Sequence, residues 1–415
     1  MNRFLSVIFV SILLSVSCIN EGADAESDIK TIDVAGAIGK GRVVQLSEIA
    51  ESIEYIPLET NPNCLVAKLT WSSAIFEKEK FYIKFNHSIF VYDKKGGFLF
   101  ELNRQGRGPQ EYDYLSDFCV EPNGNIIIRS FEKFILYDKS GKFVKILADK
   151  KYAPGIILKK CFPLDENIYL FTTELRRGTD NDYSAIILDL KSNKVFKIRY
   201  PDKEREFVKS LPNMYRYSFY EIIAMRSGDG ILLINGLDQN IMRVDSNMNI
   251  DTLFQINLGK HSPRDIPGGI FDRGGVGSSV HRYLFPFESS GYIFAQFKLG
   301  TSAHKPRVML RVSAKSEDDT FTSDISCSLF NKRTGEFFLV DQPEKNQIGF
   351  PDDFEGGPAV WPVYVSTCDH ILAYINALDL ITYSETHKVS DKFRELAGRL
   401  KETDNPVMIL VKLKK

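Results

Sequence analysis

Short apolar runs alternate with tight polar turns along most of this chain, and one unit of that pattern returns five times. In each copy an apolar run ends in Asp or Asn, two or three mostly polar residues follow, and Gly or Asn comes next. Asp and Asn bond to the backbone of a turn, and Gly and Asn tolerate a positive φ angle, so each copy predicts a tight β-hairpin. The five copies are Ile89 to Gly96, Phe134 to Gly141, Ala185 to Asn193, Ile241 to Asn249 and Cys327 to Gly335.

A further apolar run lies upstream of every hairpin, and a weaker one lies upstream of that. The strong runs begin at Phe81, Asn125, Asn167, Gly230 and Gly291, and a sixth covers His370 to Ile375. The weaker runs lie around 64–70, 115–120, 156–162, 219–225, 280–287 and 358–365. The Asp or Asn markers stand 45, 51, 56 and 86 residues apart, and the shortest spacing matches the roughly 40 to 50 residues of a propeller blade. We therefore predict an all-β fold, a six-bladed β-propeller with four-stranded antiparallel blades.

The sixth unit lacks its outer strands in the local sequence, and two distant segments can supply them. Val407 to Lys412 near the C-terminus and Ile53 to Leu58 near the N-terminus are both strongly apolar. If the N- and C-terminal strands share one blade, they close the ring and remove the open sheet edges that invite aggregation.

The first residues have the composition of an export signal. Arg3 precedes an apolar stretch at 4–16, and the small Ser17 stands before Cys18. A stretch of thirteen residues is too short to span a bilayer. The segment resembles a bacterial lipoprotein signal, which implies a lipid on Cys18 as the membrane anchor, although Ser15 stands where such signals usually carry Leu. An ordinary cleaved secretory signal is the alternative.

These observations divide the chain into three parts. We predict a lipoprotein-type signal peptide at 1–17, an acidic flexible tether at 18–40 and the propeller at 41–415. The residues after Cys18 are small, polar and acidic, so they bury too little apolar surface to order themselves.

Charge and cysteine content exclude several classes of function. The 53 Lys and Arg residues balance 54 Asp and Glu residues, with a net charge of −1, so the concentrated basic surface of a nucleic-acid-binding protein is not predicted. Apart from Cys18, an odd number of five cysteines remains, without CxxC spacing, and the six histidines lack metal-ligand spacing. We predict no metal, no cofactor and no nucleic-acid partner; the oligomeric state stays open.

The long insertions fall in connections that all return to one face of a propeller. They cover 102–114, 174–183, 201–218, 257–278, 299–323, 342–357 and 377–405. Binding residues concentrate on loops presented by a rigid scaffold, so we place recognition on this face and in the funnel beneath it. The last insertion contains a predicted helix within about 384–404, capped by Ser390, which either covers the funnel or packs passively against the disc.

Arginine and aromatic residues are the candidate ligand contacts. Arg forks and aromatic faces suit sugars, acidic glycans or protein partners. The candidates are Arg104, Arg107, Glu111, Tyr112, Arg176, Arg177, Tyr183, Arg216, Arg282 and Trp361. Structural roles stay open for them: the first three would equally serve an ion network between blades, and core packing would equally explain Trp361.

Several motifs together carry a family resemblance. They are the run from Arg104 to Tyr112 (RQGRGPQEY), the Tyr-Asp-Lys-x-Gly hairpins, the Ile56-Pro-Leu-Glu-Thr60 segment and the lipoprotein-like start. With them the chain resembles the six-bladed β-propeller lipoproteins of gut anaerobic bacteria, which are related to NHL-repeat propellers. The resemblance spans nearly the whole mature chain. It implies a protein anchored in the cell envelope, at the outer membrane and toward its surface, and it brings no catalytic residues with it.

Two functional hypotheses from different classes follow. The leading one is an envelope-anchored binding or scaffold lipoprotein that recognises a glycan, peptide or partner protein through its long-loop face, as an accessory to nutrient uptake. The alternative is a propeller hydrolase, lyase or lactonase whose site is assembled in the funnel from several blades. No local catalytic motif is visible, which favours binding, and the fold by itself decides neither.

Overall fold

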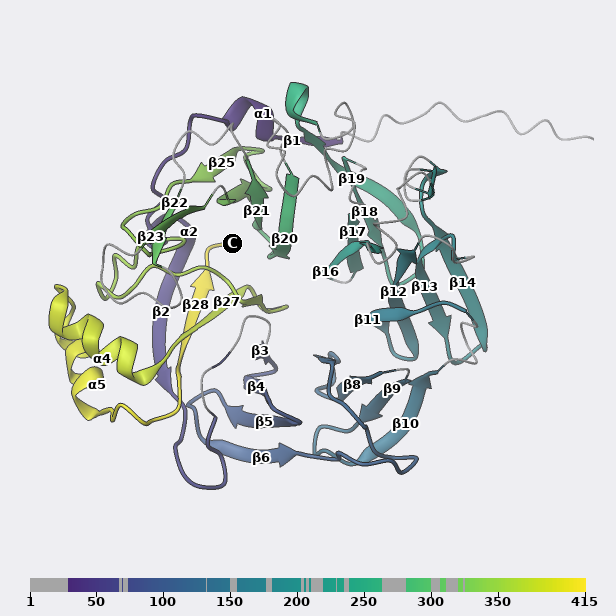
Figure 1. Cartoon of the computed structure of the whole chain (residues 1–415), viewed down its shortest axis with the longest axis horizontal. Coiled ribbons are helices and arrows are strands. Elements are labelled where there is room, and N and C mark those ends of the chain that lie inside the picture. The colour runs from purple at the N-terminus through teal and green to yellow at the C-terminus, as the bar shows by residue number, and fades with distance from the viewer. Residues whose placement is uncertain are drawn as a thin grey trace, which may run out of the picture.

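Six four-stranded antiparallel sheets stand in a ring around a common axis in this computed structural model, so the protein is a six-bladed β-propeller (Figure 1). The structure describes residues 29–66, 69, 74–131, 133–149, 155–176, 181–202, 205–206, 209, 219–228, 230–234, 239–262, 281–299, 307–310, 320–323 and 325–415.

The first four blades follow one another along the chain. Blade one comprises β3 (Ala74–Glu77), β4 (Lys80–Phe85), β5 (Ser88–Asp93) and β6 (Phe98–Leu102), and blade two comprises β7 (Asp117–Val120), β8 (Ile126–Ser130), β9 (Lys133–Tyr137) and β10 (Phe143–Ala148). Blade three comprises β11 (Leu158–Asp165), β12 (Ile168–Arg176), β13 (Tyr183–Asp189) and β14 (Lys194–Arg199), with β15 (Phe219–Glu221) paired to β12. Blade four comprises β16 (Ile223–Ser227), β17 (Gly230–Ile234), β18 (Asn240–Val244) and β19 (Ile250–Asn257). The 3-10 turn η2 (Gly259–His261) follows β19.

The last two blades contain the larger insertions. Blade five comprises β20 (His281–Glu288), β21 (Tyr292–Lys298), β24 (Ile325–Asn331) and β25 (Phe337–Val340), with the hairpin β22 (Arg307–Leu310) and β23 (Thr320–Ser323) inserted after β21. Blade six comprises β26 (Tyr364–Val365), β27 (His370–Ile375), β28 (Val407–Leu413) and β2 (Ala50–Pro57). Helices α4 (Ala377–Thr386) and α5 (Asp391–Arg399) lie between β27 and β28.

The C-terminal strand and β2, from the N-terminal part of the chain, meet in blade six, which confirms the predicted ring closure. The N-terminal strand β2 pairs antiparallel with the C-terminal strand β28, with Ile53 opposite Val411 and Tyr55 opposite Ile409. Because β28 also pairs with β27, the C-terminal strand lies between two neighbours and carries the connection between the two ends of the ring.

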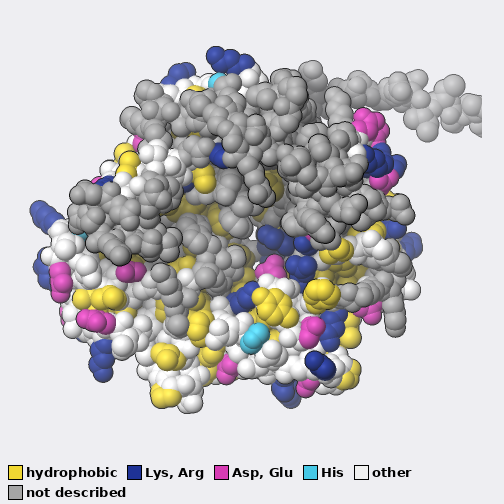
Figure 2. Space-filling model, in the orientation of Figure 1, with side chains coloured by type: hydrophobic (Ala, Val, Ile, Leu, Met, Phe, Trp, Pro, Cys, Tyr) yellow, Lys and Arg dark blue, Asp and Glu magenta, His cyan; other side chains and the backbone are white. Residues whose placement is uncertain are grey.

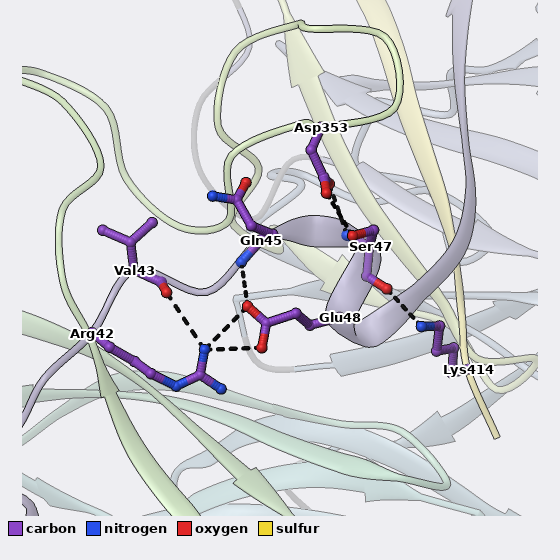
Figure 3. Close-up of polar contacts among 7 residues, drawn as sticks. All are labelled: Arg42, Val43, Gln45, Ser47, Glu48, Asp353 and Lys414. Atoms are coloured by element: carbon purple, nitrogen blue, oxygen red, sulfur yellow. Dashed lines mark hydrogen bonds and ion pairs between the residues drawn. The ribbon is translucent and has the colours of Figure 1, made fainter.

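A short helix on the N-terminal side adds polar contacts to this closure (Figure 3). Helix α2 (Leu46–Ile49) precedes β2, and Ser47 donates from its backbone N and its Oγ to Asp353, at 2.9 and 2.5 Å. Lys414 Nζ donates to the carbonyl of Ser47 at 2.6 Å, and Arg42 pairs with Glu48 at 2.9 Å. The helix is thereby tied both to the loop before blade six and to the residue that follows β28.

The hydrophobic core is divided into layers between neighbouring blades. Successive side chains of a strand point to opposite faces of its sheet, so each blade contributes to two layers. In β8, Ile126 and Ile128 pack against residues of blade one, and Ile127 packs against residues of blade three. The same division holds around the ring, and Phe, Tyr, Ile and Leu fill the layers. This explains why apolar runs, rather than strict alternation, marked the inner strands in the sequence.

The repeated hairpin turns have the predicted chemistry. In blade two, the Asp138 carboxylate accepts hydrogen bonds from the backbone N of Ser140 and of Lys142, and Gly141 has φ +81°. The hydrogen bond from the Ser140 hydroxyl lowers the pKa of Asp138 below its ordinary value. The matching positions with positive φ are Gly96, Asn193, Met248 and Gly335.

Blade four departs from the predicted turn. Met248, rather than Asn249, has the positive φ, at +67°. Asn249 instead bonds to Asp245 through both its backbone N, at 2.8 Å, and its side chain, at 2.9 Å. Asn249 therefore stabilises the turn through its hydrogen bonds to Asp245, while Met248 adopts the left-handed backbone conformation.

Three segments differ from the sequence prediction. The inner strand of blade one is β3, at 74–77, and not the run at 64–70; Cys64 and Val66 are buried loop residues that fill the layer between blades six and one. The predicted tether at 18–40 extends too far. Residues 30–33 form β1 (Lys30–Asp33), which pairs parallel with β19, and α1 (Val34–Ala37) follows. Burial of Ile32 and Val34 supplies the apolar surface that orders this segment.

The insertion after β27 holds two helices where one was predicted. Ser390 caps α5 by accepting a hydrogen bond from the backbone N of Phe393, as expected. The ring of Phe393 packs edge-on against Tyr55 of β2, with centroids 4.8 Å apart. In Figure 1 both helices lie at the outer edge of the ring beside β2, so they pack against the disc and do not cover the central funnel.

Antiparallel pairing sends the connections of every blade alternately to two faces. The turns between first and second strands and between third and fourth strands, such as 78–79 and 94–97, lie on one face, which we call the short-turn face. The other connections, such as 103–116 and 376–406, lie on the opposite face, which we call the long-loop face.

Candidate functional site

Charged side chains from the first three blades lie where the inner strands meet the long-loop face. Lys84 and Arg129 stand near the ends of β4 and β8, Asp117 begins β7, and Lys159 and Glu174 lie at the same ends of β11 and β12. We call this group, together with Lys160, the long-loop mouth. Lys and Arg side chains gather near the centre of the ring in Figure 2.

Several charged groups of the long-loop mouth are buried or half-buried, which strengthens the interactions between them. The Lys159 Nζ lies 2.6 Å from Glu174 Oε2, and the Glu174 side chain is only 1% exposed. Lys84 is half-buried and donates to the carbonyl of Ser116 at 2.7 Å; burial lowers its pKa, while the nearby Asp117 raises it. Four cations face two carboxylates, which leaves the mouth with an excess of positive charge.

Two exposed aromatic side chains stand beside this charged group. Phe131, in the turn between β8 and β9, is 72% exposed, and Tyr114, in the connection before β7, is 55% exposed. The Tyr114 ring lies edge-on to His87, with centroids 6.1 Å apart. Ser130 donates a hydrogen bond to Asp113, which ties the two aromatic segments together. Such faces contribute little to the fold and offer stacking surfaces to a ligand.

The opposite end of the inner strands is bridged by contacts between blades. Arg226 of blade four donates to the carbonyl of Val120 in blade two at 3.3 Å, across the axis of the ring. Tyr364 of blade six donates to Glu77 of blade one at 2.8 Å. Burial raises the pKa of Tyr364 well above its ordinary value, so its hydroxyl stays protonated and keeps donating. These contacts join segments of different blades at the short-turn end of the inner strands.

The predicted motif at 104–112 splits into internal and exposed residues. The Tyr112 ring is fully buried, and its hydroxyl donates to the carbonyl of His87 at 2.5 Å. The Glu111 carboxylate accepts from the backbone N of Gly108 at 2.8 Å. Arg104 and Arg107 are exposed, and neither guanidinium forms an ion pair with the described residues. The two arginines are therefore exposed on the connection between blades one and two, whereas Glu111 and Tyr112 shape the loop.

The remaining candidates are placed only in part. Tyr183 begins β13, is half-buried and has Lys197 Nζ 4.7 Å from its ring centroid. Trp361 precedes β26 rather than lying within it; it is 6% exposed and stacks on Phe350 with centroids 5.7 Å apart, which is a packing role. Arg176 and Arg282 lie on β12 and β20 without a described side chain, and Arg177, Arg216 and Cys18 lie outside the described residues.

No group of three or more His, Cys, Asp or Glu within the described ranges is arranged to hold a metal ion. The part of the chain that the structure describes also contains no helix with the length and apolarity needed to cross a membrane. The five cysteines after Cys18 are all free thiols; Cys161 is buried, and burial raises its pKa.

Comparison with protein families matches residues 29–412 to DUF4934, a domain of unknown function. The chain belongs to this family. The match covers every described element, so the whole ring, including its shared blade, is one family domain. No curated protein matches the chain.

Several solved structures are similar to this DUF4934 protein at low sequence identity. A protein of Bacteroides fragilis, described as exported, has a TM-score of 0.62 at 16% identity, covering 93% of this chain and 100% of its own. A member of the DUF4221 family from Bacteroides vulgatus has a TM-score of 0.45 at 11% identity, covering 88% and 97%. An extracellular domain of a one-component system from B. thetaiotaomicron has a TM-score of 0.33 at 11% identity, covering 66% and 30%. The first of these likenesses supports the propeller fold.

Sequence reasoning missed most of the residues of the DUF4934 long-loop mouth, although one signal was present. Lys84 and Arg129 interrupt apolar strands 45 residues apart, the same distance that separates the markers Asp93 and Asp138. They are thus equivalent positions in consecutive blades, each near the end of a second strand. A basic residue at one repeat position is a sign of a shared surface. Phe131 could also have been noticed as an aromatic residue in a two-residue turn.

Proposed function

We propose that this chain is an exported, envelope-anchored binding protein that holds an acidic glycan at the long-loop mouth. The observation that carries the proposal is the combination of basic side chains from three blades with two exposed aromatic rings on the same face. Cations attract the carboxylates of an acidic sugar, and aromatic faces stack on its ring.

A glycan strand suits the shape of this site better than a protein surface does. Lys and Arg side chains gather near the centre of the ring in Figure 2, where a slender chain can approach the axis, and Arg104 and Arg107 are exposed toward solvent. A peptide or a partner protein remains an outcome that the experiment below would reveal. We propose binding without turnover, because each carboxylate of the mouth faces a basic residue: Glu174 is paired with Lys159, and Asp117 lies opposite Arg129 in the β7–β8 ladder.

Binding is tested by titrating the chain from Ile29 to Lys415 with polygalacturonate and with neutral dextran in a calorimeter. We expect polygalacturonate to bind and dextran to bind at least about tenfold more weakly, because several charge-assisted hydrogen bonds are lost. Lys160→Gln and Phe131→Ala should each weaken binding. The loss of one base-stacking aromatic contact costs roughly 1–3 kcal/mol in nucleic-acid complexes, which sets the scale for Phe131.

The matched control is Phe354→Ala, since Phe354 is an exposed aromatic residue, 39% exposed, in the loop beside the helices. It should leave affinity unchanged. The proposed site would be wrong if the chain bound both polymers with equal affinity. It would also be wrong if all three variants lost the same amount of affinity for polygalacturonate. Mass spectrometry of the recovered polymer distinguishes the enzyme alternative, which requires shortened or rearranged chains.

The anchor is proposed at Cys18, on the strength of the apolar stretch at 4–16 and the small residue before the cysteine. The likeness to a protein described as exported supports transport out of the cytoplasm. We place the anchor in the outer membrane, in keeping with a role at the cell envelope. In the bacterium that makes it, the native chain should sediment with membranes and incorporate labelled fatty acid, and Cys18→Ala should abolish both. A labelled fatty acid on the Cys18→Ala chain would contradict the anchor.

A further inference from the structure

The inner strands of three blades end in a buried carboxylate on the short-turn face. Glu77 ends β3, Glu121 follows β7 and Glu288 ends β20, and these residues are 4%, 6% and 7% exposed. A buried carboxylate is costly unless its oxygens accept hydrogen bonds. The partners of these three groups can therefore be compared blade by blade.

In blades one and two, both oxygens of the carboxylate are bonded within the protein. Glu77 accepts from the Tyr364 hydroxyl at Oε1, at 2.8 Å, and from the Thr367 hydroxyl at Oε2, at 2.7 Å. Glu121 is bonded in the same way, by a tyrosine of the next blade at Oε1 and by an asparagine of its own turn at Oε2. The neighbouring blade completes the site in both cases.

Among the described residues, no side chain of a neighbouring blade bonds to the corresponding carboxylate of blade five. Lys332 Nζ lies 2.6 Å from Glu288 Oε1, and the Glu288 side chain is 2% exposed. Glu288 Oε2 is also buried, and none of the described residues donates a hydrogen bond to it. The position that a neighbouring side chain fills in blades one and two is here an open acceptor.

This acceptor faces a polar cavity between blades four, five and six. The cavity has a volume of about 370 Å³, and its lining includes Arg226, Arg243, Glu288, Lys332 and Asp369. Asp369 already accepts from the backbone N and the hydroxyl of Ser290, both at 2.6 Å. The lining thus holds three cations against two carboxylates, of which only Glu288 has an unbonded oxygen.

A basic groove continues from the cavity. It has a volume of about 480 Å³, shares Lys332 with the cavity, and is also lined by Lys30, Arg333 and Lys415, with no carboxylate side chain among the lining residues. The cavity and the groove together present positive charge around one buried acceptor. An anion that also carries a hydrogen-bond donor would satisfy both features.

We infer that the short-turn face holds a second binding site, in which Glu288 and Arg226 bind a small hydroxylated anion such as a sugar acid or a sugar phosphate. A hydroxyl of the ligand donates to Glu288 Oε2, and its carboxylate or phosphate accepts from Arg226 and the neighbouring cations. A hydroxyl fits better than an ammonium group, because Lys332 already neutralises Glu288 and a further cation would be repelled. This site is separate from the proposed long-loop mouth and does not depend on it.

The experiment is a calorimetric titration of the chain from Ile29 to Lys415 with glucuronate, glucose 6-phosphate, glucose and hexanoate. We expect one or both hydroxylated anions to bind, and glucose and hexanoate to bind at least about tenfold more weakly, since each lacks one of the two recognised groups. The comparison of the carboxylate with the phosphate ester identifies which anion the site prefers.

Two variants separate the roles of the two residues. Arg226→Gln should weaken binding of the anions at least about tenfold. Glu288→Gln should reduce the preference for glucuronate over hexanoate, a ratio that a general loss of stability would leave unchanged. Lys95→Gln is the matched charge control, because Lys95 is an exposed residue of the same face in blade one.

Three results would overturn the inference. The first is no binding of either hydroxylated anion, in which case water occupies the cavity and donates to Glu288. The second is an equal loss of anion affinity in Arg226→Gln and Lys95→Gln. The third is an unchanged preference for glucuronate over hexanoate in Glu288→Gln. Lys160→Gln should leave this binding intact, so failure of the long-loop mouth and failure of the second site are distinguishable.

Discussion

Replacing Val411 with aspartate is expected to open the ring and lower the free energy of unfolding by more than about 4 kcal/mol. Val411 is completely buried in the central position of blade six, opposite Ile53 of β2 and Ile371 of β27. A carboxylate at this position would lie among the apolar side chains of the layer between blades five and six. The strand that carries it, β28, pairs with both β2 and β27, so its loss exposes two unpaired strand edges.

The measurement is a urea titration of the Val411→Asp variant, with soluble yield and size as further readouts. Lys412→Gln is the control, because the Lys412 side chain is 52% exposed and its ion-pair partner, Glu51, is also exposed. Exposed ion pairs add little stability, so this variant should unfold near the native midpoint. If both variants unfolded at the same urea concentration, the pairing of β2 with β28 would not hold the ring closed.

The fold was predictable because its information is local and repeated. Each marker such as Asp138 specifies its own turn, and the apolar runs on either side supply the strands. The closure was predictable because two apolar segments remained without local partners, at 53–58 and 407–412. The repeated hairpin thus predicts the structure of each blade, and the two apolar segments without local partners predict how the ring closes.

Features without a repeat were harder to predict. The run at 64–70 is as apolar as a strand, yet Cys64 and Val66 fill a layer between blades as loop residues. β1 is short and polar except for Ile32, and only the exposed edge of β19 makes it a strand. Tertiary contacts decide both cases, and no local pattern reports them.

The candidate sites also combine features that the sequence predicts with features that only the folded ring determines. Loop length correctly indicated which face carries the insertions, because antiparallel connectivity alone determines it. The residues of the long-loop mouth come from strands of three blades, and their proximity depends on the ring. Glu288 could not be singled out in the sequence at all, because it differs from Glu77 and Glu121 only in that no described residue of a neighbouring blade donates a hydrogen bond to it.

A second large effect is expected at one glycine of the repeated turn, and the repeat itself supplies the control. Gly96 and Gly335 occupy the same turn position in blades one and five, with φ angles of +86° and +75°. A Cβ atom on Gly96 would lie 2.1 Å from the carbonyl oxygen of Pro57, at the end of β2, whereas a Cβ atom on Gly335 would meet nothing within 4 Å. The two positions therefore share a backbone conformation and differ in their surroundings.

Gly335→Ala should cost roughly 1–2 kcal/mol of stability, which is the cost of an alanine in the left-handed region. Gly96→Ala carries this cost and adds an overlap with the backbone of β2, for a total of about 2–5 kcal/mol. Gly141→Ala should fall between them, because its Cβ would lie 3.4 Å from the Phe100 ring, a side chain that can shift slightly. Urea midpoints of the three variants give the order directly. Of the three glycines, only Gly96 lies against β2. The difference in urea midpoint between Gly96→Ala and Gly335→Ala therefore measures how much the contact between blade one and β2 contributes to stability. Equal midpoints would show that this contact contributes none.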